Sequence, residues 1–197
     1  MGSAAKRKAA QARCKAKKQE AKQKYGACKK CGGKHKCPDE CILSTWNPNC
    51  CPKKNGVRQT PHHVVPKHCF ADANGKLPNC KKYAAGSAPC ICVTGKSKVK
   101  KHGEIHDQFD PVENGFRDTA KGVHQQKGVW SYGEAADAGA QSVEKVTGCP
   151  YDCVKDQIDD YHHDRGIDDS TRLRADSTGK KVKTLPRSKG KAADAWA

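Results

Sequence analysis

The sequence predicts a small α+β domain that is rich in cysteine. Only 35% of the 197 residues are hydrophobic and 6% are aromatic, which leaves little material for a large apolar core. The chain has 13 cysteines, and small cores are commonly reinforced by disulfides or by a bound metal ion. Two short β-rich runs precede several stretches of helical character, which gives the mixed fold class.

The first part of the chain divides into a basic arm and a cysteine-rich segment. Residues 1–25 are rich in Ala, Lys and Gln and have high helix propensity without an apolar stripe, so we expect a solvated helical arm or linker. Residues 26–58 are rich in Cys, Gly, Pro and Asn, and we expect disulfides or zinc to stabilise them. No run in the sequence is long and apolar enough to span a bilayer.

The centre of the expected fold lies at residues 59–115. We expect a strand at residues 59–66 and a second one at residues 88–95, where "APCICVTG" alternates and is rich in β-formers. A short helix should begin in "HGEIHDQFDP". Pro111 should end this helix, because proline removes a backbone donor and clashes with the preceding turn.

The rest of the chain is expected to form a helical extension and a tail. The extension covers residues 116–169 and contains two helical patterns, at residues 133–146 and 150–164. Residues 170–197 are polar, and we expect a mobile tail there.

The net charge of +17 favours a polyanionic partner, either nucleic acid or an anionic membrane surface. The charge is uneven along the chain. Residues 1–36 hold thirteen Lys or Arg against one acid, whereas residues 107–169 hold six against fourteen. This asymmetry predicts that one end of the chain contacts phosphates and that the other contacts something else.

The cysteine spacing leaves two interpretations open. The stretch "CKKCGGKHKCPDEC" offers four thiolates that could hold structural zinc tetrahedrally, Cys28, Cys31, Cys37 and Cys41. The alternative is a disulfide framework, which the wide dispersal of the cysteines favours. The odd count leaves at least one cysteine outside any intramolecular pair, and Cys14, isolated in the basic arm, is our candidate.

Four histidines have spacings that suit a metal site. His62 and His63 are neighbours on the first expected strand, so their side chains should point to opposite faces. His102 and His106 are four residues apart, which places both imidazoles on one face of a helix as two potential metal ligands. The order is a strand with a histidine pair, a second strand, and a helix with two histidines.

Two other groups of histidines fit this arrangement less well. His68 lies beyond the end of the first strand and is interpreted as a bystander. His162 and His163, in "DDYHHDRG", are surrounded by acids and are interpreted as part of a polar helix face.

The stretches "TPHHVVP", "APCICVTG" and "HGEIHDQFDP" together resemble the HNH/endonuclease VII superfamily, and within it the bacterial polymorphic toxins with a GHH signature. The resemblance covers about residues 59–115 and implies a ββα-metal nuclease motif. It implies one divalent ion (Mg, Mn, Ni or Zn) held by His62, His102 and His106. It also implies that His63 is the general base and that an asparagine orients it, for which Asn79 is the candidate. Pro61 stands where the family usually has glycine.

The resemblance implies a metal-dependent, largely sequence-nonspecific DNA endonuclease that acts as an antibacterial toxin. Such domains lie behind a spike-tip module in type VI secretion effectors, are delivered into the cytoplasm of a target cell, and are neutralised by a cognate immunity protein. No membrane partner is implied. We expect part of the acidic stretch to support the immunity contact. An RNase of the same fold and a non-enzymatic, cysteine-rich module that binds nucleic acid are the alternatives.

Overall fold

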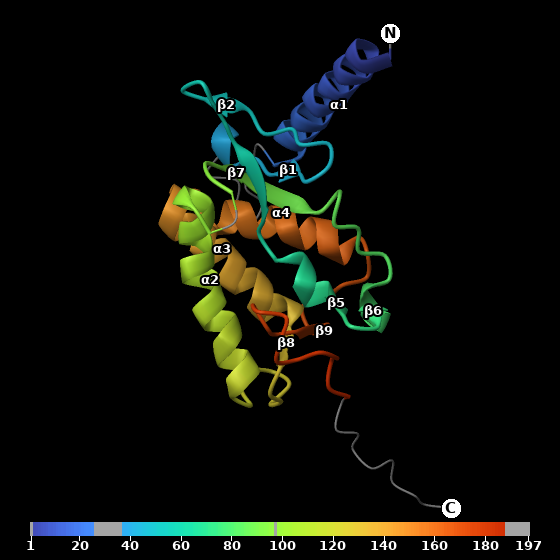
Figure 1. Cartoon of the computed structure of the whole chain (residues 1–197), viewed down its shortest axis with the longest axis vertical. Helices are drawn as coiled ribbons and strands as arrows, with labels where there is room; N and C mark the ends of the chain where they lie inside the picture. The colour runs from blue at the N-terminus through green and yellow to red at the C-terminus, as the bar shows by residue number, and fades with distance from the viewer. Residues whose placement is uncertain (1, 26–36, 97, 188–197) are drawn as a thin grey trace, which may run out of the picture.

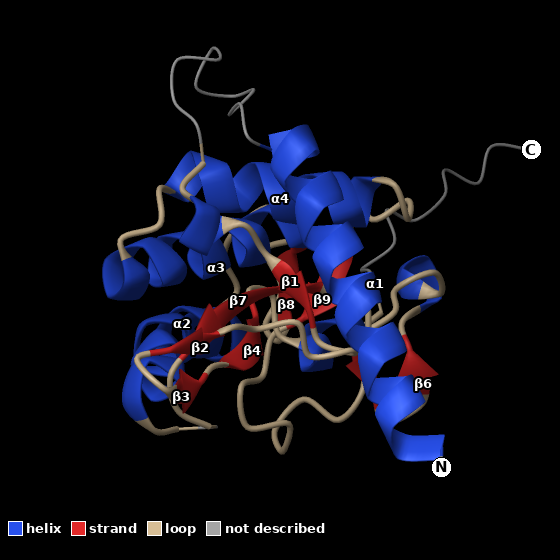
Figure 2. Cartoon of the chain, turned by 90° about the horizontal axis from the view of Figure 1, so that it is seen from above, coloured by secondary structure: helices blue, strands red, loops and turns tan. Residues whose placement is uncertain are grey.

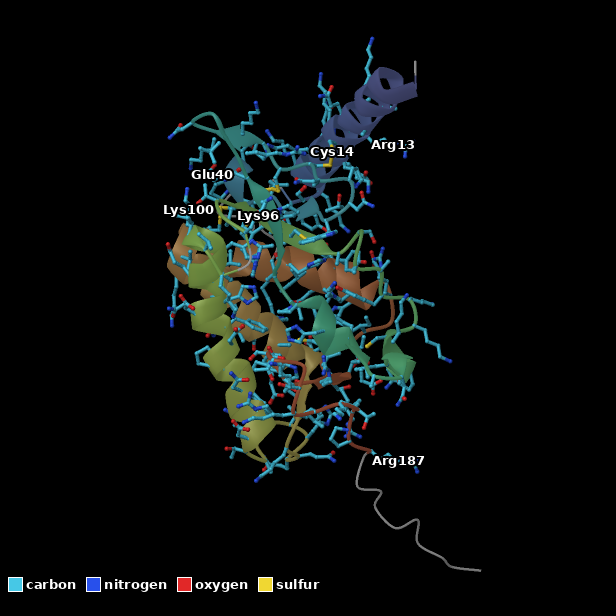
Figure 3. The ribbon with its side chains drawn as sticks, viewed as in Figure 1. Arg13, Cys14, Glu40, Lys96, Lys100 and Arg187 are labelled. Atoms are coloured by element: carbon cyan, nitrogen blue, oxygen red, sulfur yellow. A yellow bond between two sulfur atoms is a disulfide. The ribbon has the colours of Figure 1, made fainter. Side chains whose placement is uncertain are left out.

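The computed structural model describes residues 2–25, 37–96 and 98–187, with side chains from residue 8 onward (Figure 1). Helix α1 (Gly2–Tyr25) extends away from the body at one end of the molecule, and the last described residue, Arg187, lies at the opposite end (Figure 3). None of the described helices is long and apolar enough to cross a membrane.

A three-stranded antiparallel sheet carries the first histidine pair. Its strands are β1 (Ser44–Thr45), β7 (Pro89–Val93) and β4 (Thr60–His63), in the order β1-β7-β4. The two strands expected at residues 59–66 and 88–95 are therefore present and pair with each other. Figure 2 shows this sheet between the helices. Pro61 lies in β4, an edge strand, where a missing backbone donor is tolerated.

The other strands form short two-stranded ribbons, and three 3₁₀ helices connect the elements. The ribbons pair β2 (Lys53–Lys54) with β3 (Val57–Arg58), β5 (Ala71–Asp72) with β6 (Gly75–Lys76), and β8 (Val129–Ser131) with β9 (Arg172–Arg174). The 3₁₀ helices are η1 (Asp39–Cys41), η2 (Lys67–Phe70) and η3 (Pro78–Cys80).

Helix α2 (Lys100–Asp118) continues through Pro111, so the expectation that this proline ends the helix was wrong. Pro111 lies on the exposed side, where water can satisfy the carbonyl that loses its partner. The buried face continues on both sides of the proline, from Ile105 and Phe109 to Phe116. Packing of this face therefore outweighs the local effect of the proline.

Two further helices complete the core, α3 (Tyr132–Thr147) and α4 (Tyr151–His163). They lie close to the expected ranges of 133–146 and 150–164. A reciprocal pair of hydrogen bonds between Ser131 and Glu134 begins α3, and Gly148, at φ +78°, ends it. Helix α3 packs between α2 and α4. One hydrophobic core joins all three helices to the sheet.

His162 belongs to this core, so the interpretation of "DDYHHDRG" as a polar helix face was wrong for this residue. Its ring stacks on Phe70 at 5.0 Å and lies 4.7 Å from the ring of Tyr132. His163 is exposed and contacts Asp169 at 3.2 Å. Neighbouring helix positions point about 100° apart, so one histidine faces the core while the next faces solvent.

The expected mobile tail is ordered between residues 170 and 187. Strand β9 pairs with β8, and Leu173 is fully buried. The carboxylate of Asp176 accepts backbone hydrogen bonds from Lys181 and Val182, which folds the following turn. The prediction of a tail was therefore wrong for these residues, and residues 188–197 lie outside the described part of the chain.

Four disulfides join distant parts of the described chain: Cys14–Cys50, Cys37–Cys153, Cys41–Cys149 and Cys51–Cys92. The disulfide alternative is thus confirmed for Cys37 and Cys41, whose sulfurs are not available as zinc ligands. Cys28 and Cys31 lie outside the described residues.

The free cysteines of the described residues are Cys69, Cys80 and Cys90, all of them buried. Cys14 is not free. It projects from α1 (Figure 3) and ties the helix to the loop at Cys50, so our choice of Cys14 as the unpaired cysteine was wrong. An ion pair between Lys24 and Asp160, at 3.3 Å, adds a second contact between α1 and the body.

Candidate metal centre

Three histidines from two elements meet at one point. A ring nitrogen from each of His62, His102 and His106 lies within 4.8 Å of the others. His62 comes from β4, and the other two come from successive turns of α2. The rings of His62 and His102 are 4.5 Å apart between centroids, and those of His62 and His106 are 4.8 Å apart. The structure therefore brings together the three residues that the sequence suggested as ligands.

Close packing of the turn between β7 and α2 places His102 in this group. The backbone N–H of His102 donates to the carbonyl of Thr94 at 3.0 Å. Gly95 has φ +97°, and a Cβ there would lie 1.9 Å from the carbonyl oxygen of Val99. A Cβ at Gly103 would lie 2.5 Å from the carbonyl carbon of Lys98. Glycine at both positions lets the helix begin immediately beside the sheet.

Hydrogen bonds fix the orientation of the two helix histidines. The Nδ1 of His106 donates to the carboxylate of Asp110 at 3.1 Å. The Nδ1 of His102 lies 3.3 Å from the hydroxyl oxygen of Thr60, which itself donates to a backbone carbonyl. Both rings then have the proton on Nδ1, which leaves Nε2 with a free lone pair. This is the arrangement in which metal-binding histidines are normally held.

The third histidine of the group has an unsatisfied nitrogen. The Nδ1 of His62 is buried and has no hydrogen-bond partner in the described part of the molecule. A buried polar nitrogen without a partner is unfavourable by about 1–3 kcal/mol. A cation shared with the other two imidazoles would remove this deficit, so the three residues fit a divalent metal ion.

The protonation of the group also suits a metal. Burial lowers the pKa of His62 well below its usual value, and the charges of His102 and His106 lower it further. Burial and the charge of His106 lower the pKa of His102 to about 4. Both rings are therefore neutral near pH 7, and a metal ion does not have to displace a proton from either.

His63 faces the other side of the strand. In the β4–β7 register His62 is opposite Ile91 and His63 is opposite Cys90, so the two histidines point to different faces. The Nε2 of His63 lies 2.9 Å from the carbonyl oxygen of Ala85. A carbonyl can only accept, so Nε2 carries the proton and Nδ1 has the free lone pair.

The surroundings of His63 keep its imidazole neutral. Burial lowers its pKa, against the raising effect of the hydrogen bond to Ala85. The ring also stacks on Trp46, with 4.8 Å between centroids and 16° between planes. His63 directly follows His62 on β4, and it interacts electrostatically with both His62 and His102. A neutral imidazole with a free nitrogen beside a metal centre has the properties of a general base.

Asn79 lies apart from these contacts, in the exposed 3₁₀ helix η3. Among the described residues, Ala85 accepts a hydrogen bond from the His63 ring and Trp46 stacks on it. Sequence reasoning missed both. A backbone carbonyl has no signature in the sequence, and Trp46 belongs to the cysteine-rich segment that showed no periodicity.

A second cluster of potential ligands lies away from this centre. His68 hydrogen bonds to the buried carboxylate of Glu113 at 2.8 Å, and the sulfur of Cys69 lies 3.8 Å from the same carboxylate. Burial raises the pKa of Cys69 well above its usual value, so the thiol stays protonated and is a poor ligand. Glu113 also accepts from the backbone N–H of Asp176 at 2.8 Å. We assign this cluster to the attachment of the C-terminal segment to α2.

Residues 59–162 match the model of the family described as "GHH signature containing HNH/Endo VII superfamily nuclease toxin 2". The match covers more than half of the chain and includes the three histidines, and the chain belongs to this family of nuclease toxins. It is also similar to DNase toxin Tse7 of Pseudomonas aeruginosa, with 28% identity over 154 residues.

This similarity covers 71% of the chain but only 39% of Tse7, so the chain spans about two fifths of the length of this relative. No solved structure matches the chain. The family match reaches the end of α4, well beyond residues 59–115 on which the sequence resemblance rested. Helices α3 and α4 are thus part of the family's domain.

Proposed function

We propose that the chain is a metal-dependent DNA endonuclease that acts as an antibacterial toxin. One observation carries the proposal: three ring nitrogens from a strand and a helix lie within 4.8 Å of one another, and the residue after His62 on the strand is a histidine with a free nitrogen. In this proposal β4, β7 and α2 form the ββα-metal motif. The name of the relative, a DNase toxin, supports DNA as the substrate.

His62, His102 and His106 would hold the ion through nitrogens that no hydrogen bond occupies. A bound divalent ion stabilises negative charge on the scissile phosphate and on the leaving oxygen. Three imidazole ligands suit first-row transition ions better than Mg²⁺, which prefers oxygen ligands. Thr60 and Asp110 hold two of the rings, so the ligand geometry exists before the substrate binds.

His63 would act on the attacking water. Its Nδ1 accepts a proton from the water as the new P–O bond forms and the ester P–O bond breaks. The other proton stays on Nε2 and is donated in a hydrogen bond to the carbonyl oxygen of Ala85, which stabilises the charged ring that results. The orienting role that the family gives to an asparagine would belong here to the Ala85 carbonyl rather than to Asn79.

Positive charge beside the site supports a polyanionic substrate. Four lysines lie before or at the start of α2, within six residues of His102 in the chain: Lys96, Lys98, Lys100 and Lys101. Lys96 and Lys100 lie at the same end of the molecule as α1 (Figure 3). The basic face of α1 would add contacts to phosphates that depend on salt but not on sequence.

The proposed setting is contact-dependent delivery, by a type VI system, into the cytoplasm of a target bacterium. A spike module and an immunity protein are the further partners proposed. Four disulfides are typical of a protein that passes through an oxidising compartment. Part of the acidic stretch 107–169 is used internally, since Glu113 and Asp159 are buried. Its exposed acids are the part proposed for the immunity contact.

Cleavage of supercoiled plasmid tests the proposal. We expect nicking in Mn²⁺, Ni²⁺, Zn²⁺ or Mg²⁺, no nicking in EDTA, and loss of activity in His63→Ala. His163→Ala is the matched control, since His163 is exposed and lies outside the site. Wild-type rates from His63→Ala would show that the proposed mechanism is wrong. A parallel digestion of RNA decides between the DNase and its RNase alternative.

A further inference from the structure

Trp46 is an exposed aromatic side chain beside the proposed base. It is 46% exposed, and the other large hydrophobic side chains exposed in the described residues are valines. Trp130, by comparison, is completely buried in the core. One face of the Trp46 ring covers His63 in a nearly parallel stack. A ring that is about half exposed and covered on one face presents its other face to solvent.

The backbone around Trp46 is held on both sides. Thr45 pairs with Pro89 of β7, and the N–H of Asn47 donates to the carbonyl of Gly86 at 2.8 Å. Disulfides flank this stretch, since Cys41 is bonded to Cys149 and Cys51 to Cys92. The indole is thus presented by a fixed backbone, which reduces the entropy lost when a ligand orders it.

A cation lies near the histidine that the indole covers. Lys67 is exposed, begins η2, and interacts electrostatically with His63. An aromatic surface next to positive charge is the combination by which proteins bind single-stranded nucleic acid, with bases stacked on rings and phosphates on cations.

We propose that the solvent-facing side of the Trp46 ring stacks on an unpaired nucleobase of the DNA substrate. That base belongs to the DNA strand in which His63 activates water for cleavage. The inference rests on the proposed function, and it adds a substrate preference. Stacking requires a base that is free of its partner, so single-stranded or locally melted DNA should bind better than an intact duplex. Every base has an aromatic face, so the site should tolerate any sequence.

Binding in EDTA tests the site without cleavage. We would titrate wild type, Trp46→Ala and Trp46→Phe into a labelled oligothymidylate and into an abasic deoxyribose-phosphate strand of the same length, and follow fluorescence anisotropy. Trp46→Ala should weaken binding of the thymidylate by roughly 5- to 100-fold, the usual effect of losing one base stack. Trp46→Phe should keep most of the affinity. On the abasic strand, wild type and Trp46→Ala should bind equally.

Val123→Ala is the control, because Val123 is 69% exposed and lies outside the site. Far-UV circular dichroism shows whether Trp46→Ala is folded. Equal binding of the thymidylate by wild type and Trp46→Ala would overturn the proposal, even if cleavage slowed, because Trp46 would then only position His63. An equal loss on both strands would overturn it as well. The His63→Ala digestion fails or succeeds independently of these titrations, so the two proposals are separable.

Discussion

Gly103→Ala should disturb the metal centre although residue 103 contacts no ion. An added Cβ would lie 2.5 Å from the carbonyl carbon of Lys98 and 2.6 Å from its oxygen, whereas ordinary contact begins at 3.4 Å. The first turn of α2 must therefore move away from the preceding loop by roughly 1 Å. Metal–ligand distances tolerate only about 0.2 Å. His102, in the same turn, would leave its position relative to His62 and His106.

The size of the effect follows from overpacking, which is unfavourable by about 1–3 kcal/mol. If the turn moves, the same energy corresponds to roughly 5- to 150-fold weaker metal binding. Calorimetric titration of EDTA-treated, dialysed protein with Ni²⁺ or Zn²⁺ measures the affinity. Urea unfolding with intact disulfides measures whether the clash also lowers the free energy of unfolding.

Gly115→Ala on the same helix is the matched control. A Cβ there would meet only the flexible end of the Lys121 side chain, at 2.6 Å. Both substitutions gain about 1 kcal/mol of helix propensity, so their difference isolates the clash with the backbone. We expect Gly115→Ala to be at least as stable as wild type, with unchanged metal affinity. If Gly103→Ala behaves in the same way, close packing at residue 103 does not position His102.

Three other substitutions probe the site and its support. Asp110→Asn should weaken metal binding about 10- to 100-fold in the same calorimetric titration, because it removes the carboxylate that orients the His106 ring. An unchanged affinity would contradict this role of Asp110. Replacing both Cys51 and Cys92 by serine should lower the free energy of unfolding, measured in urea, by about 4 kcal/mol. This is the chain-entropy value for a disulfide that closes a loop of 41 residues. A decrease of less than about 1 kcal/mol would refute it. Burial lowers the pKa of His162 to about 4, compared with about 6.5 in an unfolded chain. As the pH falls, the unfolded chain therefore takes up this proton before the folded chain does. The free energy of unfolding should decrease between pH 6.5 and pH 4. His162→Phe should flatten that pH dependence, and an unchanged slope would assign the dependence to other groups.

The local patterns of the sequence were sufficient to assign each histidine of the group to a strand or a helix. The short β-rich run at residues 59–66 indicates a strand, and the spacing of His102 and His106 indicates one helix face. Both patterns depend only on near neighbours in the chain. The meeting of these elements was supplied by a family resemblance rather than by any local rule.

The features that sequence reasoning missed depend on contacts between distant segments. The carbonyl of Ala85 reaches His63 across 22 positions, and β9 finds its partner β8 more than forty residues earlier. Strand β9 reads Arg-Leu-Arg, so its polar sequence hides one buried leucine. The expectation that Pro111 ends the helix failed for a related reason. The buried face of α2 is stabilised by packing against a core that the local sequence does not show.

Two disulfides join the same pair of segments, Cys37–Cys153 and Cys41–Cys149, and they close loops of similar size, with separations of 116 and 108 residues. Either bond alone keeps the stretch before β1 attached to α4, so loss of one bond removes little of the constraint on the unfolded chain. In a reducing cytoplasm the stretch is released only after both bonds have been broken in succession. Under the delivery proposed above, the pair would act as a delay, because the chain would keep the stretch before β1 attached until both bonds had been reduced.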